Sequence, residues 1–191
     1  MLKHLPLKAA FACAVLLIGP GVAQADITLN NTVTGEPLNL DDAPADGRDV
    51  AGFKEFMQSG KNPYNGKVDC LAKGQELFNG ACSGCHGHLA EGKIGPALKD
   101  DYWTYPQNAT DKGMFETVFG GASGQMGPMY NSVNVDEMLL AMAWVRHLYD
   151  GKPENAEWLE ADARKTLKPH KEGDPVPAPG PDAPQECKMG G

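Results

Sequence analysis

The chain has 191 residues, of which 41% are hydrophobic and 22% are charged, and its 17 basic and 25 acidic residues give a formal net charge of −8. A protein this acidic is repelled at long range by nucleic acids and by anionic membrane surfaces, so we predict that it binds no nucleic acid. Its length allows one folded domain with extensions.

The first 25 residues have the pattern of a cleaved export signal. Lys3 and Lys8 give a positive start, an apolar run follows at residues 9–18, and Ala23-Gln24-Ala25 is a small-residue cleavage site. The apolar run is too short to span a bilayer and no later stretch approaches that length, so we predict no membrane insertion. Cleavage removes two lysines and no acid, which leaves 15 basic and 25 acidic residues and a net charge of −10. We predict a soluble, monomeric product in the periplasm.

Residues 26–67 form a predicted N-terminal extension. Residues 27–33 have a weak strand pattern and are followed by a turn signal. Phe53 and Met57 share one face of a predicted short helix that Gly60 ends.

Residues 68–150 form the predicted core, which contains three main helices. The first covers about residues 69–79 and contains Gly74. A glycine in mid-helix costs about 1 kcal/mol relative to alanine. A close crossing with another helix would explain it, because only a residue without a Cβ lets two backbones approach so closely.

The other two core helices have clear start signals. One covers about residues 111–119, with Thr110 as its cap and a Gly-Gly pair as its stop. The other follows Asn134, which forms a predicted capping box with Glu137 three residues later. Its apolar residues keep helical spacing as far as Tyr149.

Residues 151–191 form a predicted C-terminal extension. Trp158 and Leu159 are expected to anchor a short helix. From residue 169 onward, repeated prolines impose extended backbone. Such a tail is mobile unless something holds it.

The cysteine count provides a tether for this tail. Cys13 leaves with the export signal, and Cys82 and Cys85 belong to a separate motif. Cys70 and Cys187 remain as an even pair in an oxidising compartment, and we predict a disulfide between them. The alternative is two free thiols.

The most specific feature of the chain is the run Cys82-Ser83-Gly84-Cys85-His86. In an exported protein, a C-x-x-C-H run is typical of a site for covalent attachment of haem c. Two thiols on one helical turn can each bind one vinyl group of the porphyrin, and the adjoining histidine supplies the proximal ligand to the iron. The alternative is a thioredoxin-like dithiol. That would need a strand before the motif and a βαβ pattern, and the sequence shows neither.

His86 requires an acceptor for its second ring nitrogen, so that its orientation is fixed. The segment Gly95-Pro96 follows at a distance that suits a loop folded back over the proximal side. We assign the accepting carbonyl to Pro96. A plain turn is the alternative.

A sixth iron ligand is expected from the glycine-rich loop at residues 120–129, which contains Met126 and Met129. A thioether in this position raises the reduction potential and closes the iron to small molecules. We favour Met126, which lies two residues before Pro128, and Met129 is the alternative.

The remaining alternative is a sixth position that is open or held by a histidine. His88 lies too close to His86 in the chain to reach the opposite haem face. We expect His147 to be solvated on the polar side of its helix.

Residues 100–105 combine acids and aromatics. We expect Tyr102, Trp103 and Tyr105 to pack along the haem edge and to bind its propionates. Asp100 and Asp101 are candidate ligands, together with a propionate, for a calcium ion, although such a group is more often structural.

These features together resemble a class I cytochrome c. The residues that carry the resemblance are Gly74 with Leu77-Phe78, the C-x-x-C-H run, Gly95-Pro96, the methionine loop, and the helix with Trp144 and Leu148. A closer resemblance is to the cytochrome c-L family. It rests on segments that match almost unbroken, namely residues 82–88, 91–93, 95–98, 100–106, 108–113, 119–124 and 143–149, with 31–35 in the extension. The likeness covers most of the mature chain apart from the C-terminal tail.

The resemblance implies an all-α, class I cytochrome c fold, with three main helices around one covalently attached haem and extensions at both ends. It implies His86 and Met126 as axial ligands, because the family's methionine precedes Gly-Pro as Met126 does here. Where family members often have Met-Met, this chain has Gln125-Met126. A calcium ion near a haem propionate is also implied.

The resemblance further implies an electron carrier that is not an enzyme. The family accepts single electrons from the pyrroloquinoline quinone (PQQ) of methanol dehydrogenase in methylotrophic bacteria and passes them to a small cytochrome c and then an oxidase. Two alternatives stay open. One is a haem-based ligand sensor or peroxidase, which needs an open sixth position. The other is a permanent haem subunit of another quinoprotein dehydrogenase.

Overall fold

The computed structural model describes residues 26–176 and 178–188, so the predicted export signal lies outside the described residues. Within these ranges the chain contains six α-helices and no β-strand. The α-helices are α1 Ala51–Ser59, α2 Leu71–Ala81, α3 Ser83–His86, α4 Asp111–Gly120, α5 Val135–His147 and α6 Ala161–Thr166. The 3-10 turns are η1 Leu40–Asp42, η2 Val68–Cys70, η3 Pro106–Ala109, η4 Met129–Asn131, η5 Pro153–Asn155 and η6 Gln185–Cys187. No helix in the described ranges is long and apolar enough to cross a membrane.

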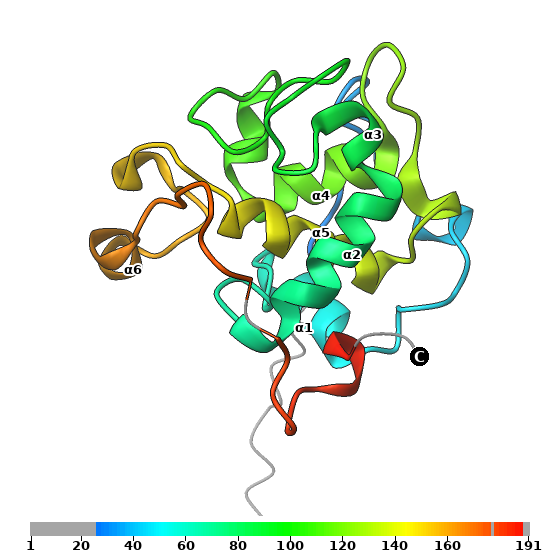
Figure 1. Cartoon of the computed structure of the whole chain (residues 1–191). Coiled ribbons are helices and arrows are strands. Elements are labelled where there is room, and N and C mark those ends of the chain that lie inside the picture. Colours follow the sequence, from blue (N-terminus) through cyan, green and yellow to red (C-terminus); the bar gives the residue numbers. More distant parts are fainter. Residues whose placement is uncertain (1–25, 177, 189–191) are drawn as a thin grey trace, which may run out of the picture.

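Helix α5 is the centre of the fold, and α1, α2 and α4 pack against it (Figure 1). Every residue of α5 is buried except Glu137 and His147. A helix that is largely apolar all round must be surrounded by other elements. Its N-terminus has the predicted capping box, in which Asn134 Oδ1 accepts from Glu137 N at 3.0 Å and Glu137 Oε2 accepts from Asn134 N at 2.9 Å. The predicted helix start is therefore confirmed.

Gly74 lies where α2 crosses α5. A Cβ at this position would stand 2.4 Å from the carbonyl oxygen of Leu140 and 3.2 Å from the Cβ of Trp144. The predicted close crossing is confirmed, since no side chain other than hydrogen fits between these two backbones.

Replacing Gly74 by alanine is therefore expected to destabilise the protein by about 2 kcal/mol, because the added methyl group pushes α2 away from α5. The same change at Gly80, in the last turn of α2, is a matched control, since a Cβ there meets nothing within 4 Å. Gly80→Ala is expected to stabilise α2 by up to about 1 kcal/mol. Denaturant unfolding followed by circular dichroism measures both; equal effects at the two sites would contradict the tight crossing.

Helices α1 and α4 are joined by phenylalanines. The rings of Phe56 and Phe115 have centroids 4.7 Å apart, and those of Phe115 and Phe119 are 5.9 Å apart. Helix α4 begins as predicted, with Thr110 Oγ1 accepting from Gly113 N at 3.1 Å. Helix α1 ends as predicted at Gly60, which has a φ of 70°.

The strand predicted at residues 27–33 does not form, and an isolated bridge between Asn30 and Pro37 stands in its place. The physical reason is that side chains satisfy the backbone here. Asn30 N donates to Glu116 Oε1 at 2.7 Å, and the N–H groups of residues 33 and 34 donate to Asn31 Oδ1. The N-terminal extension is thereby held on α4.

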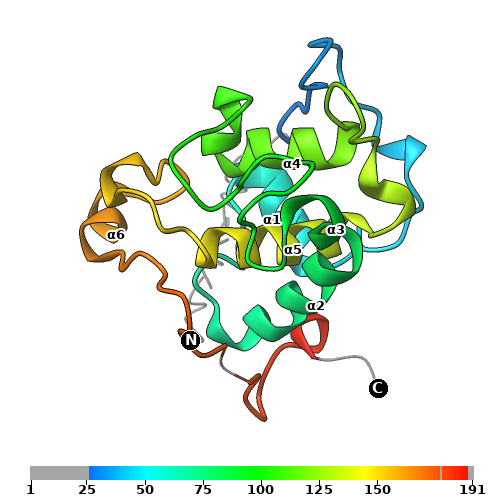
Figure 2. The ribbon, with the colours of Figure 1, turned by 45° about the horizontal axis from the view of Figure 1, so that its top comes forward.

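The C-terminal extension forms a lobe, with α6, at the side of the molecule (Figures 1 and 2). Trp158 and Leu159 directly precede α6, so a short helix follows them as predicted, although neither residue belongs to it. Trp158 instead packs edge-on against Tyr149 at a ring-centroid distance of 4.7 Å, and the guanidinium of Arg146 lies 4.1 Å from its ring. Burial against the end of α5 determines the conformation of this segment.

The end of the tail returns to the start of α2. Cys187 and Cys70 form a disulfide with a Cα–Cα distance of 4.4 Å across a separation of 117 residues. Gly180 N also donates to Asp69 Oδ1 at 2.9 Å. Figure 2 shows this last described segment beside the first turn of α2.

His147 is not solvated, contrary to expectation. Its ring stacks on Trp144 at 5.4 Å between centroids and meets the edge of His170 at 5.5 Å. The extension covers this side of α5, which the helical spacing of α5 alone does not reveal. Burial lowers the pKa of His147, and so does His170, while Asp174 raises it.

This environment predicts a loss of stability in mild acid. A histidine whose pKa is lower in the folded than in the unfolded chain contributes stability that is complete above its ordinary pKa of about 6.5 and is lost as the pH falls through the folded value. Wild type is therefore expected to lose more in melting temperature between pH 7.5 and 5 than His147→Gln does. Parallel curves for the two proteins would contradict this account.

Candidate functional site

The C-x-x-C-H run begins at Cys82, directly after α2, and continues through the single turn α3. Cys82 lies between the two helices, and its carbonyl oxygen accepts from His86 N at 3.0 Å. Ser83 Oγ donates to the carbonyl of Asn79 at 2.7 Å and ties the turn to α2. This turn brings Cys82, Cys85 and His86 to the wall of one cavity.

The cavity has a volume of about 500 Å³ and mostly apolar walls. Residues from α2, α4 and α5 line it, among them Phe78, Met114, Val118, Met138 and Met142. Its size is within the range of cofactor sites.

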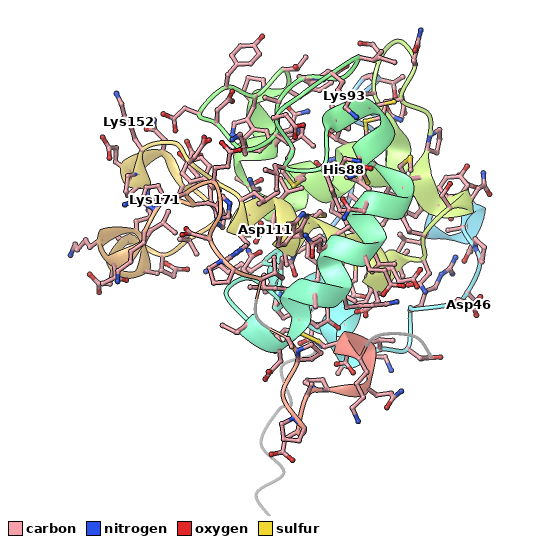
Figure 3. All side chains as sticks on the ribbon, in the orientation of Figure 1. Asp46, His88, Lys93, Asp111, Lys152 and Lys171 are labelled. Atoms are coloured by element: carbon pink, nitrogen blue, oxygen red, sulfur yellow. A yellow bond between two sulfur atoms is a disulfide. The ribbon has the colours of Figure 1, made fainter. Side chains whose placement is uncertain are left out.

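The ring of His86 is fixed by the loop that follows α3. His86 Nδ1 lies 2.9 Å from the carbonyl oxygen of Pro96, the residue assigned to this role from the sequence. Because a carbonyl can only accept, Nδ1 carries the proton and Nε2 keeps the lone pair that a metal requires. Nearby, His88 is exposed, with Nδ1 3.3 Å from Asn79 Oδ1. Figure 3 shows it at the end of the molecule that carries α3.

Gly95 is a part of the site that the sequence alone did not identify. A Cβ on Gly95 would stand 2.6 Å from Cε1 and 2.9 Å from Nδ1 of His86. The missing side chain lets the loop lie directly on the imidazole. A glycine next to Pro96 was the available signal.

Gly95→Ala is therefore expected to turn or displace the His86 ring and to weaken its contact with Pro96. The expected result is a shifted visible spectrum of the cofactor-loaded protein and a yield of loaded protein lowered by about tenfold. Gly84→Ala is the matched control, because a Cβ between the two cysteines meets nothing within 4 Å. A normal spectrum and yield for Gly95→Ala would show that the contact has no role.

Both Met126 and Met129 also line the cavity. The loop that carries Met126 closes on itself, since Ala122 N donates to the carbonyl of Met126 at 2.8 Å. Gly121 has a φ of 81° and packs against Gly127. A Cβ added to Gly121 would stand 2.9 Å from the carbonyl carbon of Gly127. The loop therefore presents two thioethers to the cavity, one on each side of Gly127 and Pro128.

The aromatic residues of the 100–105 segment divide into two groups. Trp103 and Tyr105 line the cavity, as expected. Tyr102 does not, and it is 69% exposed. Tyr102 N donates to Asp100 Oδ1 at 2.9 Å, which forms a local turn at the start of the segment.

Arg146 is a further buried residue that sequence reasoning did not single out. It is 4% exposed; its Nε donates to Asp111 Oδ1 at 3.2 Å, and its Nη2 to the carbonyl of Asn108 at 2.9 Å. The guanidinium carbon also lies 5.2 Å from the ring of Trp103. Burial lowers the pKa of Arg146 to about 10 against the opposing effect of Asp111, so it stays charged. A basic residue near the end of a largely apolar helix was the signal.

The geometry disfavours a redox dithiol. Cys82 and Cys85 are both free thiols in the structure. Burial, and then the neighbouring Cys85, raise the pKa of the Cys82 thiol to about 11. Reactive dithiols have lowered pKa values, and the described residues contain no strand on which a βαβ unit could be built.

The acids of the 100–105 segment have structural partners. Asp101 Oδ1 accepts from Tyr149 Oη and from Lys152 N. The described residues contain no group of three or more His, Cys, Asp or Glu side chains that could hold a metal ion. The calcium site implied by the resemblance therefore has no support here.

The fold and the site define a class I c-type cytochrome. The residues present fit a covalent haem, because two free thiols and an imidazole with a defined tautomer line one apolar cavity, and Gly95 leaves room for the loop over the imidazole. Residues 70–145 match the family model described as cytochrome c oxidase, cbb3-type, subunit III.

Similarity to known proteins is more specific. The chain is 48% identical over 165 residues to cytochrome c-L of Methylorubrum extorquens. The matched region covers 86% of this chain and 82% of the relative. The crystal structure of cytochrome cL from Methylophaga aminisulfidivorans has a TM-score of 0.74 and 47% identity, with 78% of this chain and 98% of that chain covered. The crystal structure of cytochrome cL from Hyphomicrobium denitrificans has a TM-score of 0.72 and 49% identity, with 77% of this chain and 88% of that chain covered. The chain belongs to the cytochrome c-L family, which makes it a monohaem cytochrome with haem c.

Proposed function

We propose that the protein is an electron shuttle that accepts single electrons from PQQ-containing methanol dehydrogenase and passes them to a small cytochrome c and then an oxidase. Family membership supports this proposal. The observation that carries it is the convergence of two free thiols, an oriented imidazole and two thioethers on one apolar cavity. Such a site is suited to holding a redox group.

Each residue of the site has a proposed role. Cys82 and Cys85 hold the haem through thioethers, His86 binds the iron through Nε2, and Met126 is the sixth ligand. Bound in this way, haem supplies one reversible one-electron couple. The carbonyl of Pro96 accepts a hydrogen bond from His86 Nδ1 and so fixes the imidazole. Trp103 and Tyr105 form the edge of the cavity, and its apolar walls exclude water. A soft thioether favours the reduced state and closes the iron to small ligands.

The charge of the chain bears on how it meets its partners. With 25 acidic and 17 basic residues, its charge argues against docking through a broad ring of lysines. Figure 3 shows the labelled Lys93 at the α3 end, whereas Lys152 and Lys171 lie on the lobe with α6. We propose docking through short-range contact near the exposed haem edge.

We also propose that residues 1–25 are a signal peptide and that the mature protein is a periplasmic monomer. Its haem domain would span residues 68–150, between extensions at 26–67 and 151–191. The family model, which matches residues 70–145, supports the limits of the haem domain. Mass spectrometry of mature protein, with cleavage expected after Ala25, tests the signal peptide.

The test of function is a rapid-mixing experiment. Oxidised protein is mixed with purified quinoprotein methanol dehydrogenase, with and without methanol, and haem reduction is followed. Fast, methanol-dependent reduction that saturates with cytochrome concentration is expected. An unrelated cytochrome c is the control, and reduction no faster than the control would show that the donor is another protein.

A further inference from the structure

Two loops form part of the rim of the haem cavity, and one side chain joins them. Tyr105, from the loop before η3, lines the cavity with its ring. Its hydroxyl lies 2.7 Å from Ser123 Oγ and accepts from Ser123 N at 2.9 Å. Ser123 belongs to the glycine-rich loop that carries Met126, so this pair connects the haem edge to the methionine loop.

The methionine loop has little else to hold its tip. Residues 123–125 are exposed, and a Cβ on Gly124, which has a φ of 90°, would meet nothing within 4 Å. Among the described residues, the side-chain hydrogen bonds to residues 122–128 both involve Tyr105. The loop also has an internal backbone hydrogen bond, from Ala122 N to the carbonyl of Met126. A loop of this composition has many conformations, and each bond that fixes it reduces the entropy lost when its methionine is held in place.

We propose that Tyr105 is a positioning residue for the sixth iron ligand and that it acts through Ser123. This inference rests on the proposed function, in which Met126 is that ligand. The Tyr105–Ser123 pair holds the loop closed over the cavity and keeps the thioether at the iron. Without the pair, the loop opens more often and an external ligand can replace the thioether.

The test measures imidazole binding to the ferric protein, followed by loss of the methionine–iron charge-transfer band. Tyr105→Phe keeps the ring that lines the cavity and removes only the hydroxyl. Loss of a hydrogen-bonded pair predicts imidazole binding tightened by about three- to tenfold. Ser123→Ala keeps the backbone donor and is expected to give a smaller effect in the same direction. The double variant should bind imidazole no more tightly than Tyr105→Phe alone, because both changes remove one interaction.

The matched control is Ser59→Ala, which removes an exposed hydroxyl that donates to the carbonyl of Glu55 at 2.8 Å on α1, where neither residue lines the haem cavity. It should leave imidazole binding unchanged. If Tyr105→Phe and Ser123→Ala both bind imidazole as wild type does, the positioning role is wrong while the ligand assignment stands. A wild-type spectrum without the charge-transfer band would overturn the methionine ligand and the positioning role together.

Discussion

Replacing Met126 by alanine is expected to abolish the methionine–iron charge-transfer band and to let carbon monoxide bind rapidly to the ferrous protein. A methyl group cannot reach the iron, so one coordination position becomes open to small molecules. The reduction potential is expected to fall by a sizeable part of the range of about 0.8 V over which axial ligands set haem potentials. Absorption spectroscopy, carbon monoxide binding and redox titration measure these effects.

Met129→Ala is the control that shows which of the two methionines is the sixth ligand. Met129 lines the same cavity from the other side of Gly127 and Pro128, and the two substitutions remove the same chemical group. Met129→Ala is expected to keep the band and the closed iron. The reverse pattern would assign the sixth position to Met129. A band kept in both single variants would exclude each methionine as the required ligand.

Breaking the disulfide has the largest expected effect on stability. Cys187→Ala releases the tail from Cys70 and removes a cross-link that closes a loop of 117 residues. Since a long cross-linked loop restricts the unfolded chain, its loss is expected to cost about 2–5 kcal/mol in free energy of unfolding. The visible spectrum of the folded protein should not change, because neither cysteine lines the haem cavity.

The cross-link predicts a particular pattern among variants. Cys70→Ala, Cys187→Ala and the double variant should be destabilised by similar amounts, because each removes the same bond. Denaturant unfolding gives the three values. Additive losses, or two free thiols in the mature wild-type protein by mass spectrometry, would contradict the cross-link.

Local signals in the sequence predicted the parts of the fold that depend on neighbouring residues. Asn134 and Glu137 formed a recognisable capping box, and Thr110 capped α4 at the predicted place. Gly74 indicated a close crossing because its cost in a helix needed a reason. The C-x-x-C-H run, Pro96 and both methionines line one cavity. The sequence indicated this, because their spacing along the chain is the spacing that binding to a single cofactor requires.

Features that depend on partners far along the chain were missed. Asn30 pairs with Glu116 across 86 residues, so a segment with strand-like composition has its backbone satisfied by a helix side chain. Arg146 likewise joins four segments, because this residue of α5 contacts Asp111 on α4 and the rings of Trp103 and Trp158. His147 was placed wrongly because a covering lobe, not the helical spacing of α5, decides its exposure. The predicted contact of Tyr102 with the haem edge stays a prediction.

The disulfide also bears on how the protein matures. The proposed attachment of haem would need Cys82 and Cys85 reduced, whereas the tether needs Cys70 and Cys187 oxidised, and both requirements would apply to one chain. The two pairs differ in accessibility, since Cys85 is exposed and Cys82 is half-buried, while Cys70 and Cys187 are 2% and 0% exposed. A thiol reductant can therefore keep the attachment site open without breaking the tether, provided that the tail has folded back first. The order of folding and reduction thus becomes part of the assembly of this cytochrome.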